Sequence, residues 1–463
     1  MIEFKLSQLA RVSGGSVIGE DITVKSVSTD SRNCKGALFI AIRGERFDGH
    51  DFVKNAVENG AVAVGISCDI RSVQDKVRTD GISVLCCADT VRLLGLCGML
   101  VRDRADCRVL SLTGSCGKTT VKEFSSAILR RMGETIATEG NFNNDIGVPL
   151  TLLNIRSTTR YAVIEQGASH LEDIKRTCEF VKPDVSLINN VGGAHIEGFG
   201  SFEGVYRGKS EILDAVLAND GIGIVPTDSK WFPRWKSDYA TAFNNGRMLT
   251  FGTARDAFVQ VSEISSRNGR IIFALRTPGS SFAVGLKMLG EHNAFNAAAA
   301  VALSLAGGAS EEAVKLGLMG LSNMKGRLCA TDYGSFTIID DAYNASFDAV
   351  KAAIDTLSAT RGYRVMIFGD MGELGDESDN LHQQVGEYAQ GKVDELLCVG
   401  EKTRKSVQSA GKEGTHFNCK ADLVEYALGL IKSHEYCSFL IKGSHAMKMD
   451  EITEALRSRG SSK

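Results

Sequence analysis

The chain contains a glycine-rich loop whose residue types and spacing can bind the phosphates of a nucleotide. An apolar run at residues 109–112 precedes the loop, and a helical pattern follows it from residue 121 to 132. In such a loop the backbone N–H groups and the helix N-terminus surround the phosphates, a lysine reaches the outer phosphates, and a hydroxyl binds magnesium. Only two residues separate its glycines, where the common phosphate-binding loop has four, so an ordinary glycine turn is the alternative. The predicted phosphate-binding residues are Gly114, Ser115, Cys116, Gly117, Lys118, Thr119 and Thr120.

Polar residues at the ends of later apolar runs are candidates for the same site. Glu165 directly follows the run 161–164, and a carboxylate there could hold the magnesium of a nucleotide, although a strand-end glutamate is often only solvated. His195 lies in a glycine-rich loop after the run 185–188, and its residue context alone favours a histidine bonded to backbone. Asn141 and Asn144 belong to a polar segment that either lines the site or forms an Asx-rich turn.

Lys209 is the most informative single residue. The segment 202–217 reads as a helix whose apolar face contains Val205, Ile212 and Val216. At about 100° per residue, Lys209 projects into that face. A charged lysine there is unfavourable unless it is paired or neutral, and the alternative is a side chain that extends out to solvent. A covalent modification that turned the Lys209 side chain from a cation into an anion would make it a metal ligand.

Two further candidates flank an apolar run at residues 336–339. Arg327 precedes it and could reach a phosphate from across a cleft, and Asp341 follows it. Taken singly, each is more often an ordinary surface residue.

The elements that must position these residues are strands alternating with helices, which predict an α/β protein with parallel sheets. A length of 463 residues suggests about three domains at roughly 150 residues each. We expect a small α/β domain at 1–87, a central domain with the glycine loop at 88–324, and a Rossmann-like domain at 325–463. Residues 228–285 look β-rich and irregular, as in an insertion.

Composition excludes several classes of protein. The net charge of −3 gives no field that favours nucleic acid or anionic membrane. The N-terminus lacks the apolar core of a signal peptide, and no apolar run reaches the ~18 residues of a membrane span. The 12 cysteines contain no C-x-x-C spacing, which favours reduced thiols in a cytoplasm.

Taken together, the motifs resemble those of the Mur ligase family of bacterial cell-wall synthesis, over nearly the whole chain. The sequence departs from the family pattern at two places. The family motif DDxYNANP is here DDAYNAS followed by Phe347, which replaces the proline. His445 stands where an arginine usually follows KGS. They affect the nucleotide and dipeptide pockets and not the implied reaction. The matching motifs are TDSR, LFIAIRGERFDGHDF, TGSCGKTT, GNFNNDIGVPLTLL, AVIEQGAS, NNVGGAHIEGFGS, GEHNAFNAAAA, KGRL, DDAYNAS, FGDMGELG and KGS.

The resemblance implies an ATP-dependent ligase in cytoplasmic peptidoglycan precursor synthesis. It is closest to the members that join D-alanyl-D-alanine to UDP-N-acetylmuramoyl-tripeptide through an acyl phosphate. It implies ATP, two Mg²⁺ sites and a carbamate on Lys209 as the chemical components. We also expect a monomer that binds no nucleic acid and does not insert stably into a membrane.

Site roles are implied only residue by residue. Lys118, Lys209, His195 and Arg327 take catalytic roles, and one magnesium binds Thr119 and Glu165 while a second binds His195 and Lys209. Asn293 and Asn296 contact the base side of the nucleotide, and Arg327 and Asp341 reach the γ-phosphate and ribose from the third domain. The expected residues for the UDP substrate are Ser28, Thr29, Asp30, Ser31, Arg32, Gly44, Phe47, Asp48, His50, Asn141 and Asn144.

Three alternatives remain open. The ligase that adds the third peptide residue shares the first-domain motifs, but its Asp-Asn-Pro-Arg signature is absent from this sequence. A P-loop ATPase that acts as a switch without ligation would not need an inward lysine or a uridine-nucleotide domain. A folylpolyglutamate-type ligase would lack the TDSR-containing first domain.

Overall fold

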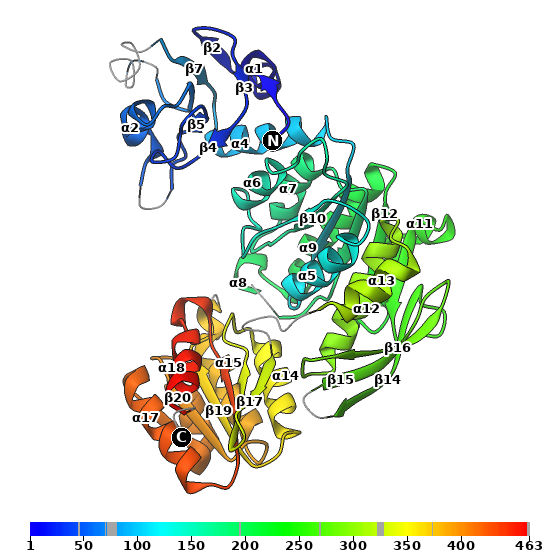
Figure 1. Cartoon of the computed structure of the whole chain (residues 1–463), viewed down its shortest axis with the longest axis vertical. Coiled ribbons are helices and arrows are strands. Elements are labelled where there is room, and N and C mark those ends of the chain that lie inside the picture. The colour runs from blue at the N-terminus through cyan, green and yellow to red at the C-terminus, as the bar shows by residue number, and fades with distance from the viewer. Residues whose placement is uncertain are drawn as a thin grey trace.

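A computed structural model describes residues 1–44, 47–69, 71, 81–193, 196–267, 270–321, 328–372 and 374–460. It confirms the predicted α/β class. Three main sheets follow one another along the chain and along the long axis of the molecule (Figure 1). The boundaries expected at residues 87 and 324 stay predictions, and the second lies outside the described residues.

The first sheet contains five short strands in the order β2-β7-β6-β5-β4, all parallel except the β2–β7 pair. A separate antiparallel pair, β1 with β3, lies beside it. Helix α4 packs in one apolar cluster with residues of this sheet and of the next, so it joins the two. The elements are β1 (Phe4–Lys5), α1 (Leu6–Ser13), β2 (Ser16–Ile18), β3 (Thr23–Val24), β4 (Val27–Ser28), β5 (Leu38–Ile40), η1 (Gly49–Phe52), α2 (Val53–Glu58), β6 (Ala63–Ile66), β7 (Ser83–Cys86) and α4 (Thr90–Arg102).

The central sheet has nine strands in the order β16-β15-β14-β13-β12-β11-β8-β10-β9. Its strands from β9 to β14 pair in parallel, with helices on both faces. One face packs against α5, α12 and α13, and the other against α4, α6, α7 and α9. Parallel strands covered on both faces are almost wholly apolar, which explains why their runs are recognisable in the sequence.

The first part of this domain contains β8 (Arg108–Thr113), α5 (Lys118–Leu129), β9 (Thr135–Ala137), α6 (Gly147–Leu152), β10 (Tyr161–Glu165), α7 (Asp173–Val181), β11 (Val185–Ile188), α8 (Ile196–Phe199), α9 (Phe202–Ala218) and β12 (Ile222–Pro226). The second part contains α10 (Phe232–Asp238), α11 (Ala240–Asn244), β13 (Met248–Gly252), β14 (Val259–Arg267), β15 (Arg270–Arg276), β16 (Ser281–Leu286), α12 (His292–Ala306) and α13 (Glu311–Met319).

Two predictions for this domain were wrong. Residues 228–285 are not an insertion, because β13 pairs in parallel with β12 and the strands β14 to β16 extend the same sheet. Antiparallel strands with one exposed face alternate in polarity, so they looked irregular beside the buried ones. Helix α5 begins at Lys118 and not at residue 121, because Gly117 at its N-cap adopts a left-handed conformation with φ of 74°.

The third sheet has the order β17-β18-β22-β19-β20-β21, with only the β17–β18 pair antiparallel. Apolar clusters fill both of its faces, as in a Rossmann-like fold. Its elements are β17 (Cys329–Asp332), β18 (Phe336–Asp340), α14 (Phe347–Ser358), β19 (Tyr363–Gly369), η3 (Gly375–Glu377), α15 (Ser378–Ala389), β20 (Glu395–Val399), α16 (Arg404–Ala410), η4 (Gly411–Glu413), β21 (Gly414–Phe417), α17 (Lys420–Ser433), β22 (Cys437–Lys442), η5 (His445–Met447) and α18 (Asp450–Gly460).

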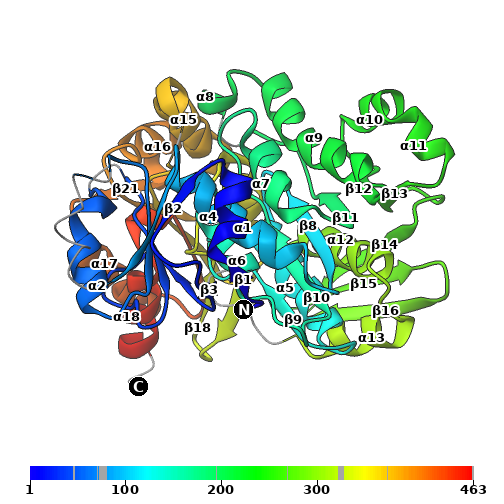
Figure 2. The same cartoon turned by 90° about the horizontal axis from the view of Figure 1, so that it is seen from above.

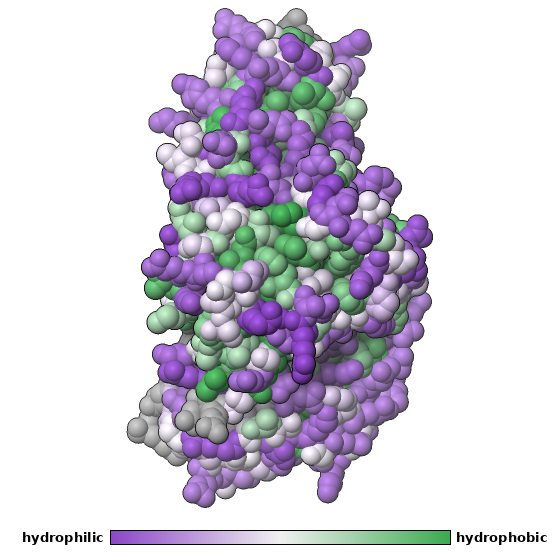
Figure 3. Space-filling model, turned by 90° about the vertical axis from the view of Figure 1, so that its right-hand side faces the viewer, coloured by the Kyte–Doolittle hydropathy of each residue, from purple (hydrophilic) through white to green (hydrophobic). Residues whose placement is uncertain are grey.

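Seen from above, the central sheet and its outer strands extend to one side of the long axis (Figure 2). The face turned to the viewer in Figure 3 carries hydrophobic side chains over the middle of the molecule and hydrophilic ones toward both ends. Within the described parts of the chain, every helix is too short or too polar to span a bilayer. The cysteines described there are free thiols.

Candidate active site

The glycine loop joins the carboxyl end of β8 to the N-terminus of α5. A Cβ atom at position 117 would lie 2.4 Å from Asn296 Oδ1 and 2.8 Å from Asn189 Nδ2, so this position needs glycine. Lys118 is the first helical residue, and its Nζ donates to the carbonyl of Gly114 at 2.9 Å. The positive end of the helix therefore lies at the same loop as the lysine, an arrangement that attracts an anion.

Asparagine side chains that follow β11 and that lie on α12 form a layer on one side of the glycine loop and hold it in place. Asn190 Oδ1 accepts the N–H of Cys116 at 2.8 Å, and Asn189 Nδ2 donates to the Cys116 carbonyl at 2.9 Å. Asn189 Nδ2 also donates to Asn296 Oδ1 at 2.9 Å, and Asn296 Nδ2 donates to Asn293 Oδ1 at 3.0 Å. The structure therefore places Asn293 and Asn296 behind the loop, and their predicted contact with the nucleotide base stays a prediction.

Glu165 lies at the carboxyl end of β10, beside β8, with only 2% of its surface exposed. Asn143 Nδ2 donates to Glu165 Oε1 at 2.9 Å, and the backbone N–H of Glu165 donates to Thr138 Oγ1 at 2.9 Å. Its Oε2 is buried with no hydrogen-bond partner among the described residues. A buried carboxylate oxygen without a donor is unfavourable, and a bound cation would satisfy it.

Lys209 points into the protein from α9, as its position in the helical pattern predicted, and only 1% of its surface is exposed. Burial and the nearby cation of Lys118 lower the pKa of its amine to about 7. Its Nζ lies 5.7 Å from the centre of the Phe199 ring, and no carboxylate of the described residues offsets its charge. The charge of Lys118 acts on the Lys209 amine, so the two lysines lie near each other.

The polar segment before α6 contributes a residue, Asn143, that lies outside the predicted set. Asn143, and not Asn141 or Asn144, contacts Glu165. The side chain of Asn144 accepts the N–H groups of Ile146 and Gly147 at 3.2 and 2.9 Å, at the start of α6. The sequence marked the segment but could not choose among its three asparagines, because their roles depend on a contact with β10.

The third domain approaches the loop through the start of α14. Asp348 Oδ2 accepts the N–H of Gly193 at 3.1 Å, and Ser346 Oγ lies 3.8 Å from Cys116 Sγ. Asp341 pairs with Lys442 Nζ at 2.5 Å, and the charge of Lys442 acts on the Cys116 thiol, whose pKa is raised mainly by burial. The two other central predictions, His195 and Arg327, lie outside the described residues.

The predicted uridine-nucleotide residues lie in two segments of the first domain that are held by local contacts. Asp30 pairs with Arg32 at 2.8 Å, and this pairing lowers the pKa of its carboxyl to about 2. Asp48 caps η1 and contacts His50 Nδ1 at 2.5 Å, while Phe47 is 72% exposed. The remaining predicted residues there are Ser28, Thr29, Ser31 and Gly44.

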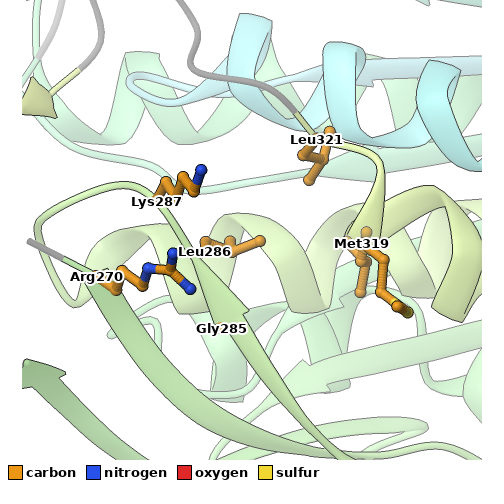
Figure 4. A pocket seen from close by; sticks show the side chains of 7 residues that line it. Arg270, Gly285, Leu286, Lys287, Met319 and Leu321 are labelled. Atoms are coloured by element: carbon orange, nitrogen blue, oxygen red, sulfur yellow. The ribbon is translucent and has the colours of Figure 1, made fainter.

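A cavity of about 520 Å³ lies elsewhere in the central domain. Arg270 and Lys287 line its strand side, and Met319 and Leu321 line its helix side (Figure 4). Helix α13 packs on the C-terminal end of α5, since a Cβ at Gly317 would lie 2.5 Å from Ile128 Cα. The 12-residue helix α5 is about 18 Å long, so this cavity is separate from the glycine loop at its other end.

Comparison with known proteins identifies the family. Residues 23–84 match the Mur ligase family catalytic domain, residues 112–304 the Mur ligase middle domain, and residues 326–445 the Mur ligase, glutamate ligase domain. The UDP-N-acetylmuramoyl-tripeptide–D-alanyl-D-alanine ligase of Escherichia coli (strain K12) is 39% identical over 99% of this chain and 100% of its own. The chain belongs to the Mur ligase family.

Solved structures agree with this Mur ligase assignment. A crystal structure of MurF from Acinetobacter baumannii has a TM-score of 0.89 and 34% identity, with 99% of each chain covered. The MurF ligase from Thermotoga maritima in complex with ADP has a TM-score of 0.82 and 25% identity, over 94% of this chain and 97% of that one. The predicted three-domain architecture is therefore confirmed.

Several residues that surround the glycine loop or contact its neighbours were missing from the predicted set. Asn189 and Asn190 directly follow β11, which lies next to β8, so their position at the carboxyl edge of the sheet was a usable signal. Lys442 ends β22 within the KGS motif and pairs with a predicted residue. Asp348 gave no signal, because its contact with Gly193 spans 155 residues of sequence.

Proposed function

We propose that this chain is an ATP-dependent amide ligase that joins D-alanyl-D-alanine to UDP-N-acetylmuramoyl-tripeptide in peptidoglycan precursor synthesis. The observation that carries the proposal is the 39% identity to a ligase of this name over the full length of both chains. The glycine loop, the buried Glu165 and the inward Lys209 supply what such a reaction needs. A cytoplasmic, monomeric protein belongs to the same proposal.

In the first step, an oxygen of the tripeptide's terminal carboxylate attacks the γ-phosphorus of ATP. The bond from that phosphorus to the β–γ bridging oxygen breaks, ADP leaves, and an acyl phosphate forms. Lys118 and the first turn of α5 hold the phosphates, whose negative charge spreads in the transition state. The asparagine layer holds the loop in place, so the loop needs no rearrangement during the reaction.

In the second step, the amine of D-alanyl-D-alanine attacks the acyl carbon. An amide bond forms, the bond from carbon to the phosphate oxygen breaks, and phosphate and a proton are released. A carboxylate alone is a poor acyl donor, because it would have to expel oxide. The phosphorylated acid has a good leaving group, and this explains why ATP is consumed.

The residues present fit a magnesium ion. Glu165 Oε2 is a buried oxygen without a partner among the described residues, and oxygen ligands are those that Mg²⁺ prefers. Thr119, next to Lys118 in the first turn of α5, is the hydroxyl that would complete this site with Glu165. When bound, the metal would neutralise charge on the phosphates. A second site would use His195 and Lys209.

Lys209 would join the second site as a carbamate. With its pKa near 7, a large share of the amine is neutral at physiological pH and can attack carbon dioxide. A nitrogen–carbon bond forms, a proton leaves, and the side chain becomes an anion. That change replaces an unpaired buried cation by a ligand for metal, next to the cation of Lys118.

The outer parts of the site complete the proposal. The segments 28–32 and 44–50, with Asn141 and Asn144, would bind the UDP substrate. Arg327 and Asp341 would reach ATP from the third domain, which requires closure of the domains. Asn293 and Asn296 would lie toward the nucleotide, behind the loop that they support.

The test is an assay of phosphate release with ATP, the tripeptide nucleotide and different amines. We expect release only when D-alanyl-D-alanine is present. Release with a free amino acid and the dipeptide nucleotide would instead indicate the ligase that adds the third residue. Release without any amine would indicate a switch ATPase. Neither alternative is favoured, because the full-length match is to a D-alanyl-D-alanine ligase.

A further inference from the structure

Lys122 is a second buried lysine of the central domain, and the mechanism above does not use it. It lies on α5, one turn after Lys118, and only 1% of its surface is exposed. Its ammonium group donates to the backbone carbonyl of Thr138 at 2.6 Å and pairs with Glu123 at 2.9 Å. A lysine buried to this extent is rare and needs such partners, so the position has a specific role to explain.

The carbonyl that Lys122 holds belongs to the residue that supports Glu165. Thr138 follows the edge strand β9, and its own N–H donates to Val163 of β10 at 3.1 Å. Its side-chain oxygen accepts the N–H of Glu165 at 2.9 Å. Thr138 therefore continues the pairing of β9 with β10 up to the carboxylate.

A second support of Glu165 starts from the same place. The loop that follows Thr138 carries Asn143, which donates to Glu165 Oε1 at 2.9 Å. The carbonyl of Asn143 accepts the N–H of Gly167 at 2.8 Å. Both the backbone and the carboxylate of Glu165 are thus held by a segment that Lys122 fastens to α5.

We propose that Lys122 is a positioning residue that fixes the Glu165 carboxylate relative to the phosphate-binding loop. The inference rests on the proposed function, because it assumes that Thr119 and Glu165 share one magnesium. Thr119 and Lys122 belong to one helix, so a link from that helix to Thr138 connects the two ligands through a short, buried path. Residues behind metal ligands commonly tune metal affinity in this way.

The charge of Lys122 suits this role better than a neutral donor would. A hydrogen bond from an ammonium group is shorter and stronger than one between neutral groups. Glu123 is 40% exposed at its side chain and offsets the charge from the solvent side. The link therefore stays strong without leaving an unpaired charge inside the protein.

The test compares Lys122→Met with the wild type by calorimetry of a non-hydrolysable ATP analogue, with and without Mg²⁺. We expect K122M to lose about tenfold in the affinity measured with Mg²⁺, as for other residues that support metal ligands. Binding in EDTA should be unchanged, because Lys118 and the loop remain. Thr138→Val keeps the carbonyl but removes the acceptor for Glu165, so it should give the same loss. The double variant should be no worse than either single one.

Ser126→Ala is the matched control, because Ser126 is buried on the same helix and its Oγ donates to the Lys122 carbonyl at 2.7 Å. It should leave the Mg²⁺ dependence unchanged. The inference is overturned if K122M and T138V keep the wild-type response to Mg²⁺ even though K122M lowers the melting temperature. A wild-type protein that ignores Mg²⁺ would instead overturn the metal site of the proposed function, and the inference with it.

Discussion

The surroundings of two lysines in the central domain differ, although both side chains are 1% exposed. On α5, the Lys122 ammonium group has the Thr138 carbonyl at 2.6 Å and the Glu123 carboxylate at 2.9 Å. Lys209 on α9 faces Lys118 and the edge of an apolar cluster, and the pKa of its amine falls to about 7. Burial alone therefore does not determine the state of a lysine.

The difference indicates a structural role for Lys122 and a chemical role for Lys209. A paired ammonium group is a structural link, because it holds its acceptors in place and does not react. An unpaired amine that loses its proton near neutral pH is a nucleophile, and perturbed groups of this kind gather at functional sites. The following variants test whether this contrast is correct, beginning with the largest effect.

Lys209→Ala should lower the turnover rate on the order of a hundredfold or more, because it removes a charged group from the transition state. Bicarbonate or a short carboxylic acid should restore part of the activity by replacing the missing anion. Phosphate release with all three substrates is the measurement. Lys209→Arg should also be inactive, since a guanidinium group stays protonated and cannot form the carbamate. A fully active K209A would contradict the carbamate role.

Lys209→Met should change how stability depends on pH. The folded pKa of Lys209, about 7, lies below its ordinary value of 10.5, so between these values the unfolded chain binds more protons. The free energy of unfolding of the wild type should therefore rise with pH in this window. The contribution of Lys209 to that free energy should be lowest below pH 7. The difference in the free energy of unfolding between the wild type and K209M should increase by about 2 kcal/mol in favour of the wild type from pH 7 to pH 9.

Urea unfolding of both proteins in buffer depleted of carbon dioxide is the measurement for this pH effect. Removing carbon dioxide matters because a carbamate would stabilise the wild type by a different route. At pH 7 the methionine variant should be the more stable protein. Parallel pH profiles would show that Lys209 keeps its proton, and the contrast between the two lysines would be lost.

Much of the fold could be read from the sequence because its central strands are buried on both faces. The apolar runs that became β10, β11 and β20 are short, continuous and bounded by breakers. The inward direction of Lys209 followed from helical periodicity. The extension of the central sheet through β13 to β16 could not be read in the same way, because it depends on pairing between exposed, alternating strands.

The site was harder to predict than the fold, because its support is non-local. Asn189 and Asn296 meet across 107 residues, and Lys122 reaches Thr138 from a different element. Residue types suggested the candidate ligands, such as Glu165, since their chemistry is recognisable in isolation. Residues that hold those ligands act through geometry, which appears only after the chain has folded.

Lys122→Met should lower the free energy of unfolding by about 2 kcal/mol at pH 7, because the Thr138 carbonyl loses a charged donor. The sign is opposite to that expected for Lys209→Met at the same pH. Urea unfolding measures both variants under one condition, and Lys122→Arg should recover part of the loss. If K122M is as stable as the wild type, the ammonium group is not a structural link, and the structural role that the comparison gives to Lys122 is wrong.

Ser126→Ala should have the smallest effect. It removes a neutral hydrogen bond of 2.7 Å from the buried face of α5, worth about 1 kcal/mol. Alanine is the better helix former by roughly 0.5 kcal/mol, so the net loss should stay below about 1 kcal/mol. The same urea measurement applies, and the excess loss in K122M over S126A then reports what the charged link adds to a buried bond on this helix. Equal losses would mean that packing along α5, and not the ammonium group, accounts for the stability of this region.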